Sequence, residues 1–492
     1  MKTVFACLFL LCPVAAWAQV AVIDPATPEP AETGPRIVRL SLSPAAEPAP
    51  ALKYELLPPS SQRTPGNAAP YYYRSILWLS EHQKDFDKQY IENEKAWTEG
   101  PLDKLDKDQV RKWVEAHRLP LENLKTAVYR ETCDFDWRVQ DLRGQETIGF
   151  LLEEVQRARG LARVLRVKAR LEMAEGKLDE ALETLRHGYQ LGRDVAQPPL
   201  LINALVGVAI GRMMNETVIE LLDQPGAPNL YWAIAALPRP YIDFRPAMRT
   251  ELEMPEKLFP FLKDAETAER TPEEWQKLLI AAYSDLQLFD SGVSSGNRWL
   301  DQLSAAAILA RGYPVAKAEL IAAGYDAGKL EKMPVAQVVA IQSARVMRHA
   351  YHEIFKCTLL DYPDSAIRLK ETNDRLIRER YLGPSLAQKD PLMLTGLLLP
   401  AISNVNVASI RSARDLAALQ TIEAIRMHLA ASGKLPASLD DVAIVPVPKN
   451  PATGKPFPYE LKEGVATLVV PTLLATDERD ATHYVMTADT SK

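Results

Sequence analysis

The amino-acid sequence predicts a mainly α-helical protein that ends in a small antiparallel β module. Three observations lead to this fold class. Apolar residues recur at three- and four-residue steps over most of the 492 positions, strand patterns are scarce before residue 440, and the segment after it alternates apolar residues between prolines and turns. Because 47% of the residues are hydrophobic, the chain can bury large cores, and we expect an irregular array of helical hairpins.

The first 18 residues have the features of a secretory signal peptide. Lys2 precedes an apolar run, and Ala16, Trp17 and Ala18 form the small-x-small site that signal peptidase prefers. We therefore expect cleavage after Ala18, a mature chain that begins at Gln19, and a periplasmic or secreted location. The apolar run is shorter than the roughly 20 residues that span a bilayer, so we expect no transmembrane segment after signal removal.

Residues 19–69 are rich in proline and alanine and contain few large apolar side chains. This composition predicts an extended or disordered arm. The segment ALKYELLPP, which starts at Ala51, breaks the pattern with clustered leucine and tyrosine residues. We expect the arm to become ordered there and to pack along the body of the protein.

Residues 70–402 are expected to form a helical domain, and 403–492 a long helix with a small sheet. The first helix is predicted over 71–97. Thr271 and Glu274 have the spacing of a capping box at the start of another helix. Further helices are predicted over 106–117, 147–174, 178–195, 200–222, 272–290, 335–359 and 403–431.

The most apolar internal stretch, LLINALVGVAIGRMM, starts at Leu200. It is too short for a membrane span and contains Asn203 and Arg212. Two prolines precede it, as at many helix starts. We therefore interpret this stretch as a buried central helix.

The segment over about 161–195 resembles a tetratricopeptide-type helical hairpin. Gly176 separates two helical patterns, and small residues such as Gly188 recur on the second one, which favours a close approach of two helices. The first helix departs from the repeat, because Lys168 and Glu172 stand where apolar or aromatic residues are preferred. No second copy follows at a period of about 34 residues, so we do not expect a regular peptide-binding solenoid.

The segment CDFDW places Asp134 and Asp136 around Phe135 and beside Trp137, in a region without helical periodicity. Paired acids next to an aromatic ring are able to perform acid–base chemistry or to hold a sugar. The simpler interpretation is a loop whose Phe135 and Trp137 plug the core while the aspartates cap backbone N–H groups. These two interpretations make Asp134, Asp136 and Trp137 the candidate site residues.

Two further motifs have simpler interpretations than the chemistry they suggest. GVSSG places Ser294 in the pattern of a nucleophile elbow, but a helix pattern precedes it where that chemistry needs a strand. His349, Glu353 and Cys357 share one face of a predicted helix, but the order of ligands differs from that of zinc peptidases. We therefore predict a helix connection and a solvated or locally hydrogen-bonded face, and we assign no metal or other cofactor.

The formal net charge is −6 and the pI is about 5.8. No basic stripe with interleaved aromatic residues is present, so we do not expect a nucleic-acid partner. After signal removal the remaining cysteines are Cys133 and Cys357. In an oxidising compartment they form either one disulfide or two separate buried thiols, and the sequence leaves both options open.

The C-terminal segment contains a long amphipathic helix that stops at Gly433, a short LPASLDD element, turns at Asn450 and Gly454, and two strand patterns around a turn at Gly464. This order resembles the C-terminal part of type II secretion pseudopilins over about the last 80 residues. That resemblance implies a helix packed on a small antiparallel sheet. The N-terminal processing motif and continuous membrane helix of that family have no counterpart here, so pilus assembly is not implied.

Over nearly the whole mature chain, the sequence also resembles a family of exported proteins of planctomycete-type bacteria. The similar pieces are EPAPALKYELLPP, TPGNAAPYYYRS, CDFDW, PPLLINALVGVAIGR, MPVAQV, TGKPFPYEL and ATLVV. The resemblance marks CDFDW as a shared feature and implies no reaction.

These observations favour an exported, non-enzymatic helical protein that binds a protein or cell-envelope partner or has a structural role in the periplasm. One alternative is an accessory component of a secretion or pilus system that acts through the C-terminal module. A second alternative is a hydrolase or carbohydrate-active enzyme that uses the acids near Trp137.

Overall fold

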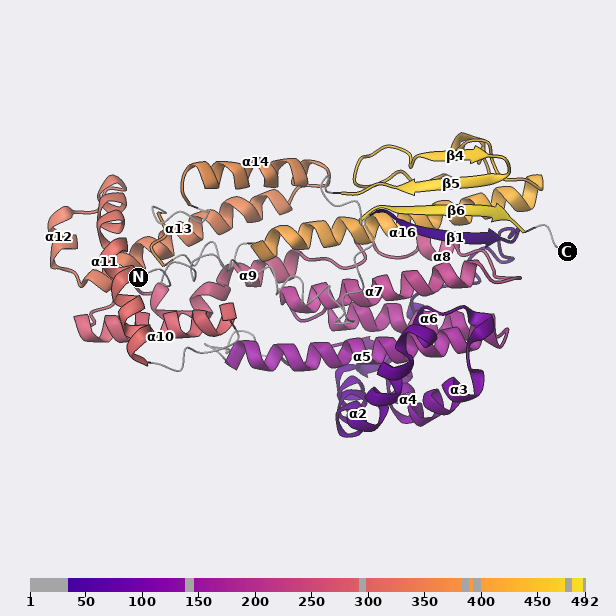
Figure 1. The fold of residues 1–492 in the computed structure, drawn as a ribbon, viewed down its shortest axis with the longest axis horizontal. Coiled ribbons are helices and arrows are strands. Elements are labelled where there is room, and N and C mark those ends of the chain that lie inside the picture. Colours follow the sequence, from indigo (N-terminus) through magenta and orange to yellow (C-terminus); the bar gives the residue numbers. More distant parts are fainter. Residues whose placement is uncertain are drawn as a thin grey trace, which may run out of the picture. The chain divides into compact units, whose positions relative to one another are not determined.

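The computed structural model describes residues 34–137, 146–291, 298–381, 389–392, 400–473 and 480–489 (Figure 1). The fold is mainly helical with a small sheet near the C-terminus, as the sequence predicts. Among the described residues, 146–150 and 245–406 form one compact unit, and 34–137, 151–244 and 407–489 form the other. The expected signal peptide, with its cleavage site after Ala18, lies outside the described residues, as does Ser294.

The larger unit contains most of the predicted helices near their expected bounds. These predicted helices are α2 (Ala69–Thr98), α3 (Lys107–Ala116), the greater part of α5 (Glu146–Ala174), α6 (Leu178–Val195), α7 (Leu201–Leu222) and the greater part of α16 (Pro400–Ser432). The unit also contains α4 (Arg118–Val128) and the short α8 (Tyr231–Ala235), which were not predicted. The sequence pattern did not reveal α4. It follows α3 after only His117, so the two helices leave no turn signal between them.

Helices α5 and α6 are joined by a short turn in which Gly176 has a φ of 76°. That left-handed conformation favours glycine, as is common just after a helix. The two polar residues that depart from the tetratricopeptide pattern have a structural role here. Lys168 donates a hydrogen bond to the Thr184 hydroxyl at 2.7 Å, and this hydroxyl donates to Glu172 at 2.7 Å. A polar contact therefore links the helices where the repeat uses apolar packing.

The small residues of α6 act at a different interface from the one we predicted, because they face α7 instead of α5. A Cβ atom added at Gly188 would lie 2.0 Å from the sulfur of Met214 on α7. A Cβ atom at Gly207 of α7 would lie 2.5 Å from the carbonyl oxygen of Gly192. At Gly207 the backbones of α6 and α7 thus approach so closely that a larger residue would clash with backbone, whereas at Gly188 the Met214 side chain would have to move.

Helix α7 is the buried central helix that the apolar stretch at Leu200 predicts. Val206, Ile210 and Leu221 are fully buried, and Asn203 is 1% exposed. Among the described residues, the structure contains no helix with the length and hydropathy that a membrane crossing requires.

The sheet of the larger unit has four strands in the order β1-β6-β5-β4. Strands β4 (Tyr459–Lys462) and β5 (Val465–Val470) form the predicted hairpin, in which Glu463 and Gly464 have φ values of 47° and 80°. Such left-handed pairs are typical of tight hairpin turns. Strand β6 (Thr482–Ala488) pairs antiparallel with β5.

The fourth strand comes from the other end of the chain. Strand β1 (Arg36–Leu42) belongs to the Pro- and Ala-rich arm and pairs in parallel with β6, with Arg36 opposite Thr482. The overall composition of residues 19–69 does not predict this strand, because its few apolar residues lie among many prolines and alanines. Its side chains Leu40 and Leu42 are buried. The arm is thus an integral part of the C-terminal sheet, beside which α16 runs (Figure 1).

A fully buried ion pair on α16 fixes the arm to the helices. Arg426 and Glu423 are both 0% exposed and lie 2.9 Å apart. The guanidinium of Arg426 also donates to the carbonyl oxygens of Ser43, Ala227 and Pro228 at 2.7 to 3.2 Å. These bonds satisfy the donors of a charge that would otherwise be costly to bury.

The carboxylate of Glu423 is held by the loop between α7 and α8. It accepts from the backbone N–H of Leu230 at 2.6 Å and from the side-chain amide of Asn229 at 3.0 Å. The same amide also donates to the carbonyl oxygen of Ala45 in the arm, at 3.3 Å. One ion pair therefore connects three segments that lie far apart in the sequence.

The regular secondary-structure elements described in the smaller unit are all helices. Its helices are α9 (Arg245–Leu258), α10 (Pro272–Ser291), α11 (Arg298–Ala322), α12 (Ala327–Lys332), α13 (Val335–Thr358) and α14 (Asp364–Arg378). The predicted capping box of α10 is confirmed. Thr271 N–H donates to the Glu274 carboxylate at 2.8 Å, and Glu274 N–H donates to the Thr271 hydroxyl at 3.2 Å.

We predict that Glu423→Gln lowers the free energy of unfolding by about 3 to 5 kcal/mol, because it leaves the Arg426 charge buried without a counter-charge. Urea denaturation of the two proteins measures this difference. Glu460→Gln is the matched control, since Glu460 pairs with Lys462 on the exposed edge strand β4 and should leave stability nearly unchanged. Equal midpoints for the two variants would show that the buried pair does not hold the unit together.

Candidate functional site

The CDFDW segment lies directly after strand β3 (Arg130–Thr132), which pairs in parallel with β2 (Thr64–Asn67). Asn67 fixes the start of the loop with both ends of its amide. Its nitrogen donates to the carbonyl oxygen of Asp134 at 2.6 Å, and its oxygen accepts from the N–H of Asp134 at 2.8 Å. The side chain of Asn67 thus continues the strand pairing into the loop.

The two acids of the loop are exposed and its two aromatic rings are half-buried. The Asp134 carboxylate accepts from the N–H of Asp136 at 2.8 Å, a local turn that holds Asp136 at a φ of 51°. Within the described part of the chain, this is the only hydrogen bond of either carboxylate. The arrangement is that of a loop whose acids stabilise its own backbone.

Phe135 and Trp137 face the helices. The indole N–H of Trp137 donates to the hydroxyl of Tyr73 at 2.8 Å, and the ring of Phe135 stacks on Tyr72 with centroids 6.1 Å apart. The Phe135 and Trp137 rings lie 5.8 Å apart in a tilted arrangement. Of the three candidate residues, Trp137 contacts the core, whereas Asp134 and Asp136 face solvent.

Beneath these rings lies an apolar cavity formed between α2, α5, α6 and α7. Its lining residues are Tyr72, Ile76, Phe135, Trp137, Ala158, Leu161, Leu191, Val195 and Asn203. Most of them also belong to one hydrophobic core cluster. The CDFDW loop is therefore the cover of this cavity.

A buried polar cluster adjoins the cavity, and sequence reasoning missed it. Asp194 of α6 accepts from the Tyr72 hydroxyl at 2.6 Å and from the Gln190 amide at 2.7 Å. Gln190 in turn accepts from Arg63 at 2.9 Å. Burial raises the pKa of Asp194 to about 6, and the bonds from Tyr72 and Gln190 limit the rise. The available sequence signal was Gln190 and Asp194 four residues apart on a buried helix face.

The nearby Cys133 is partly buried. Burial raises the pKa of the Cys133 thiol, and the charges of Asp194 and Asp134 add to this effect. Cys133 of the larger unit and Cys357 of the smaller unit are each a free thiol. A thiol with a raised pKa contains little of the reactive thiolate form.

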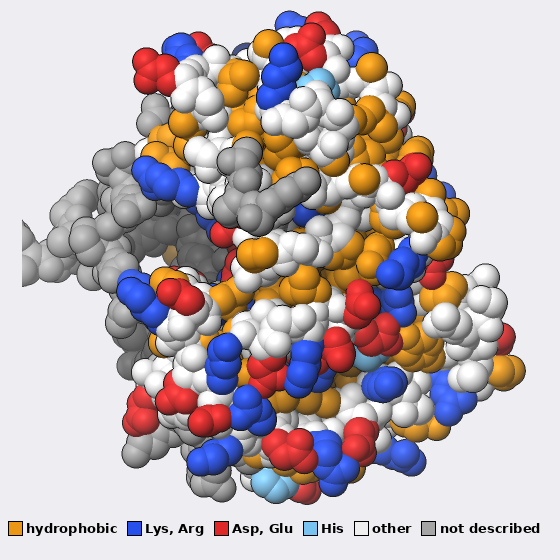
Figure 2. Space-filling view, turned by 90° about the vertical axis from the view of Figure 1, so that its right-hand side faces the viewer, with side chains coloured by type: hydrophobic (Ala, Val, Ile, Leu, Met, Phe, Trp, Pro, Cys, Tyr) orange, Lys and Arg blue, Asp and Glu red, His pale blue; other side chains and the backbone are white. Residues whose placement is uncertain are grey.

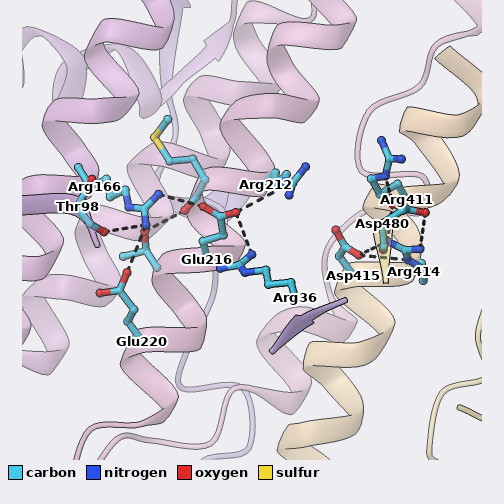
Figure 3. Close-up of polar contacts among 12 residues, drawn as sticks. Arg36, Thr98, Arg166, Arg212, Glu216, Glu220, Arg411, Arg414, Asp415 and Asp480 are labelled. Atoms are coloured by element: carbon cyan, nitrogen blue, oxygen red, sulfur yellow. Dashed lines mark hydrogen bonds and ion pairs between the residues drawn. The ribbon is translucent and has the colours of Figure 1, made fainter. Parts of the chain in front are cut away.

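A second charged cluster, which we call the arginine junction, surrounds Glu216 of α7 (Figure 3). Arg36 of β1 approaches its Oε1 atom at 3.3 Å, and Arg212 of α7 approaches the same atom at 3.5 Å. Arg166 of α5 contacts the Oε2 atom at 3.0 Å. Burial alone would raise the pKa of Glu216, but the three guanidiniums outweigh it and hold the pKa below its usual value.

Glu220 extends the arginine junction by one helical turn. It accepts from Arg170 at 2.5 Å and lies 3.5 Å from Arg166. Four guanidiniums, those of Arg36, Arg166, Arg170 and Arg212, therefore share two carboxylates. Sequence reasoning did not find this cluster, because its members come from three elements that only the fold brings together.

A neighbouring cluster joins α16 to the start of β6. Asp480 lies 2.5 Å from Arg411 and 3.1 Å from Arg414, and its side chain is only 4% exposed. Arg212 points into the space between this cluster and the arginine junction (Figure 3). Burial raises the pKa of Asp415 on α16, and the charges of Arg414 and Arg212 oppose that rise. Arg212 is therefore electrostatically coupled to both clusters.

The face of α13 that carries His349, Glu353 and Cys357 forms local contacts, as one of the predicted options. Glu353 pairs with Lys356 at 2.7 Å and with Arg375 of α14. The ring of His349 lies 4.9 Å from that of Tyr381, and the Cys357 thiol contacts the carbonyl oxygen of Glu353. Among the described residues, no group of three or more histidine, cysteine or acidic side chains has a geometry that would hold a metal ion.

Comparison of the chain with protein families, with curated proteins and with solved structures finds no match. The geometry of the loop, the cavity and the arginine junction is therefore the basis for the functional interpretation.

We predict that Trp137→Ala lowers the free energy of unfolding by about 3 kcal/mol, because it removes a ring that covers the cavity and packs on Phe135. Chemical denaturation measures the loss. Asp136→Asn is the control from the same loop, and it should change stability little because its side chain is exposed. A stable Trp137→Ala protein would favour a ligand-contacting role for the ring instead.

The buried Asp194 predicts a pH dependence of known sign. Its folded pKa of about 6 lies above the unfolded value, so the native state binds more protons between about pH 4 and 6 and loses stability as the pH rises through this range. We expect the wild-type advantage over Asp194→Asn to shrink by about 3 kcal/mol from pH 4 to pH 7. Urea denaturation of both proteins across this range tests the shift, and a constant difference would contradict it.

Proposed function

We propose that this protein is an exported, non-enzymatic binding protein of the periplasm or cell envelope, and that the arginine junction recognises an acidic segment of a partner protein. Export is supported by the signal-peptide pattern around Lys2 and Ala18. The observation that carries the binding proposal is the convergence of two half-exposed guanidiniums, Arg36 and Arg212, on one oxygen of Glu216.

The charge balance of the junction favours an additional anion. Four guanidiniums share the two carboxylates of Glu216 and Glu220, which leaves an excess of positive charge. The side chains of Arg36 and Arg212 are each 49% exposed, so this excess is accessible to solvent. Guanidinium groups bind carboxylates with two parallel hydrogen bonds when their terminal nitrogens are available.

The terminal nitrogens are available in this geometry. Arg212 contacts Glu216 only through Nε, at 3.5 Å, and Arg36 contacts it through one terminal nitrogen at 3.3 Å. In the described structure neither guanidinium has another polar contact. Both distances exceed the 2.7 to 2.9 Å that is usual for a strong charged hydrogen bond. A carboxylate from a partner would therefore find donors that Glu216 does not saturate.

The junction is also positioned in advance. Arg166 donates to the carbonyl oxygen of Thr98 at 2.9 Å while it contacts Glu216, and Arg170 is anchored on Glu220. The two outer arginines therefore rest on a fixed inner layer, which reduces the entropy lost on binding. On the face drawn in Figure 2, basic and acidic side chains are interspersed.

The alternative function is a role in a secretion system through the C-terminal module. It must be tested with point variants and not with a truncation. Strand β6 belongs to that module but pairs with β1 of the arm. A truncation before Ser403 would remove the partner of β1 and disrupt the arm as well. Substitutions of exposed residues on the edge strand β4, such as Glu460→Ala with Lys462→Ala, separate the two functions more cleanly.

We predict that Arg36→Ala combined with Arg212→Ala abolishes capture of an acidic partner from a periplasmic extract, as read by mass spectrometry. The affinity of the purified double variant for a hexaglutamate peptide should fall at least about tenfold relative to wild type, because two charged hydrogen-bonding groups are lost. Binding by the wild-type protein should weaken with salt.

The matched control combines Arg118→Ala with Arg368→Ala, which removes the same charge from two exposed arginines elsewhere. This control should bind as wild type does. Capture of the same partners by the junction variant would refute the proposed site. Capture that is lost only with the β4 variant would favour the secretion alternative, and recovery of anionic lipid or polymer in place of protein would refute the acidic-protein partner.

A further inference from the structure

The cavity beneath the CDFDW loop contains one unpaired polar atom. Asn203 of α7 is 1% exposed, and its amide nitrogen donates to the carbonyl oxygen of Val195 at 3.0 Å. Among the residues that the structure describes, its amide oxygen has no hydrogen-bond partner, and Asn203 is one of the residues that line the cavity. Buried polar atoms of this kind are rare in folded proteins, and each one requires an explanation.

The remaining walls do not compete for that oxygen. The Tyr72 hydroxyl is already bonded to Asp194, and the indole N–H of Trp137 is bonded to Tyr73. The rest of the lining is aliphatic or aromatic. The cavity therefore offers an apolar enclosure with a single open acceptor, which is the pattern of a small-molecule site.

We propose that this cavity binds a small, mainly apolar molecule with one hydrogen-bond donor, of the class of phenols and small aromatic alcohols. The donor pairs with the Asn203 amide oxygen, and the ring of the ligand packs against Phe135 and Trp137. This site is independent of the arginine junction and adds a second ligand to the proposed binding function.

Entry of such a ligand requires the loop to move outward. The enclosed space as it stands is sufficient for about one water molecule. Trp137 is half-buried at the mouth of the cavity, and its indole N–H donates to the Tyr73 hydroxyl. The neighbouring Asp136 has a left-handed backbone conformation with a φ of 51°. The ring pair is thus a cover that a ligand is able to displace.

The test compares phenol with toluene, which has the same shape but no strong donor. We expect phenol to raise the melting temperature of the full protein and to bind, by isothermal titration calorimetry, at least about fivefold more tightly than toluene. Asn203→Leu should bind the two compounds equally, because the acceptor is gone. Ala158→Met, which fills the cavity from α5, should bind neither.

Circular dichroism and thermal unfolding establish that both variants fold. Equal affinity of the wild-type protein for phenol and toluene overturns the role of Asn203. The absence of binding at millimolar phenol overturns the proposal and leaves an ordered water as the partner of the amide oxygen. The Arg36→Ala and Arg212→Ala protein should bind phenol as wild type does, so failure here and failure of the arginine junction are distinguishable.

Discussion

The larger unit depends on the buried ion pair between Arg426 and Glu423. Both side chains are fully buried. Apart from their contact with each other, their hydrogen bonds among the described residues are to backbone or amide groups of distant segments, including Ser43, which lies 383 residues from Arg426. A buried charge without its partner is far more costly than a lost surface contact. The arm, the α7–α8 loop and α16 therefore fold as one cooperative assembly.

The same constraint explains why the arm belongs to the sheet. Arg426 and Asn229 donate hydrogen bonds to the carbonyl oxygens of Ser43 and Ala45, which follow directly after β1. These bonds place the strand beside β6, with which it pairs. Parallel pairing of the chain's two ends requires closure of a very long loop, and local sequence preference is unable to drive it. The strand forms because α16 provides the anchor. Arg36 is thereby carried to Glu216 and completes the arginine junction.

Local signals in the sequence predicted the local features of the fold. Helical periodicity located most of the long helices, although not α11, and the Thr271–Glu274 spacing and the turn at Gly464 were confirmed in atomic detail. What the sequence did not reveal depends on pairing at long range: the strand β1, the glycine contacts between α6 and α7, and the arginine junction. The CDFDW loop combines both kinds of feature. The sequence identified its residues as candidates, but the cavity beneath them is formed by four helices that only the fold brings together.

The two proposed sites differ in how the fold maintains them. The arginine junction is a rigid arrangement in which Arg166 and Arg170 are fixed by backbone carbonyls and carboxylates. An anionic partner therefore binds there with little loss of conformational entropy. The cavity instead lies under a loop that is anchored at Asn67 on one side and covered by two half-buried rings. Displacement of those rings exposes apolar surface to water, and only a ligand that buries an equivalent area and satisfies Asn203 offsets that exposure. Selectivity in the cavity therefore arises from the cost of opening it, whereas selectivity at the junction arises from an imbalance of charge that already exists in the free protein.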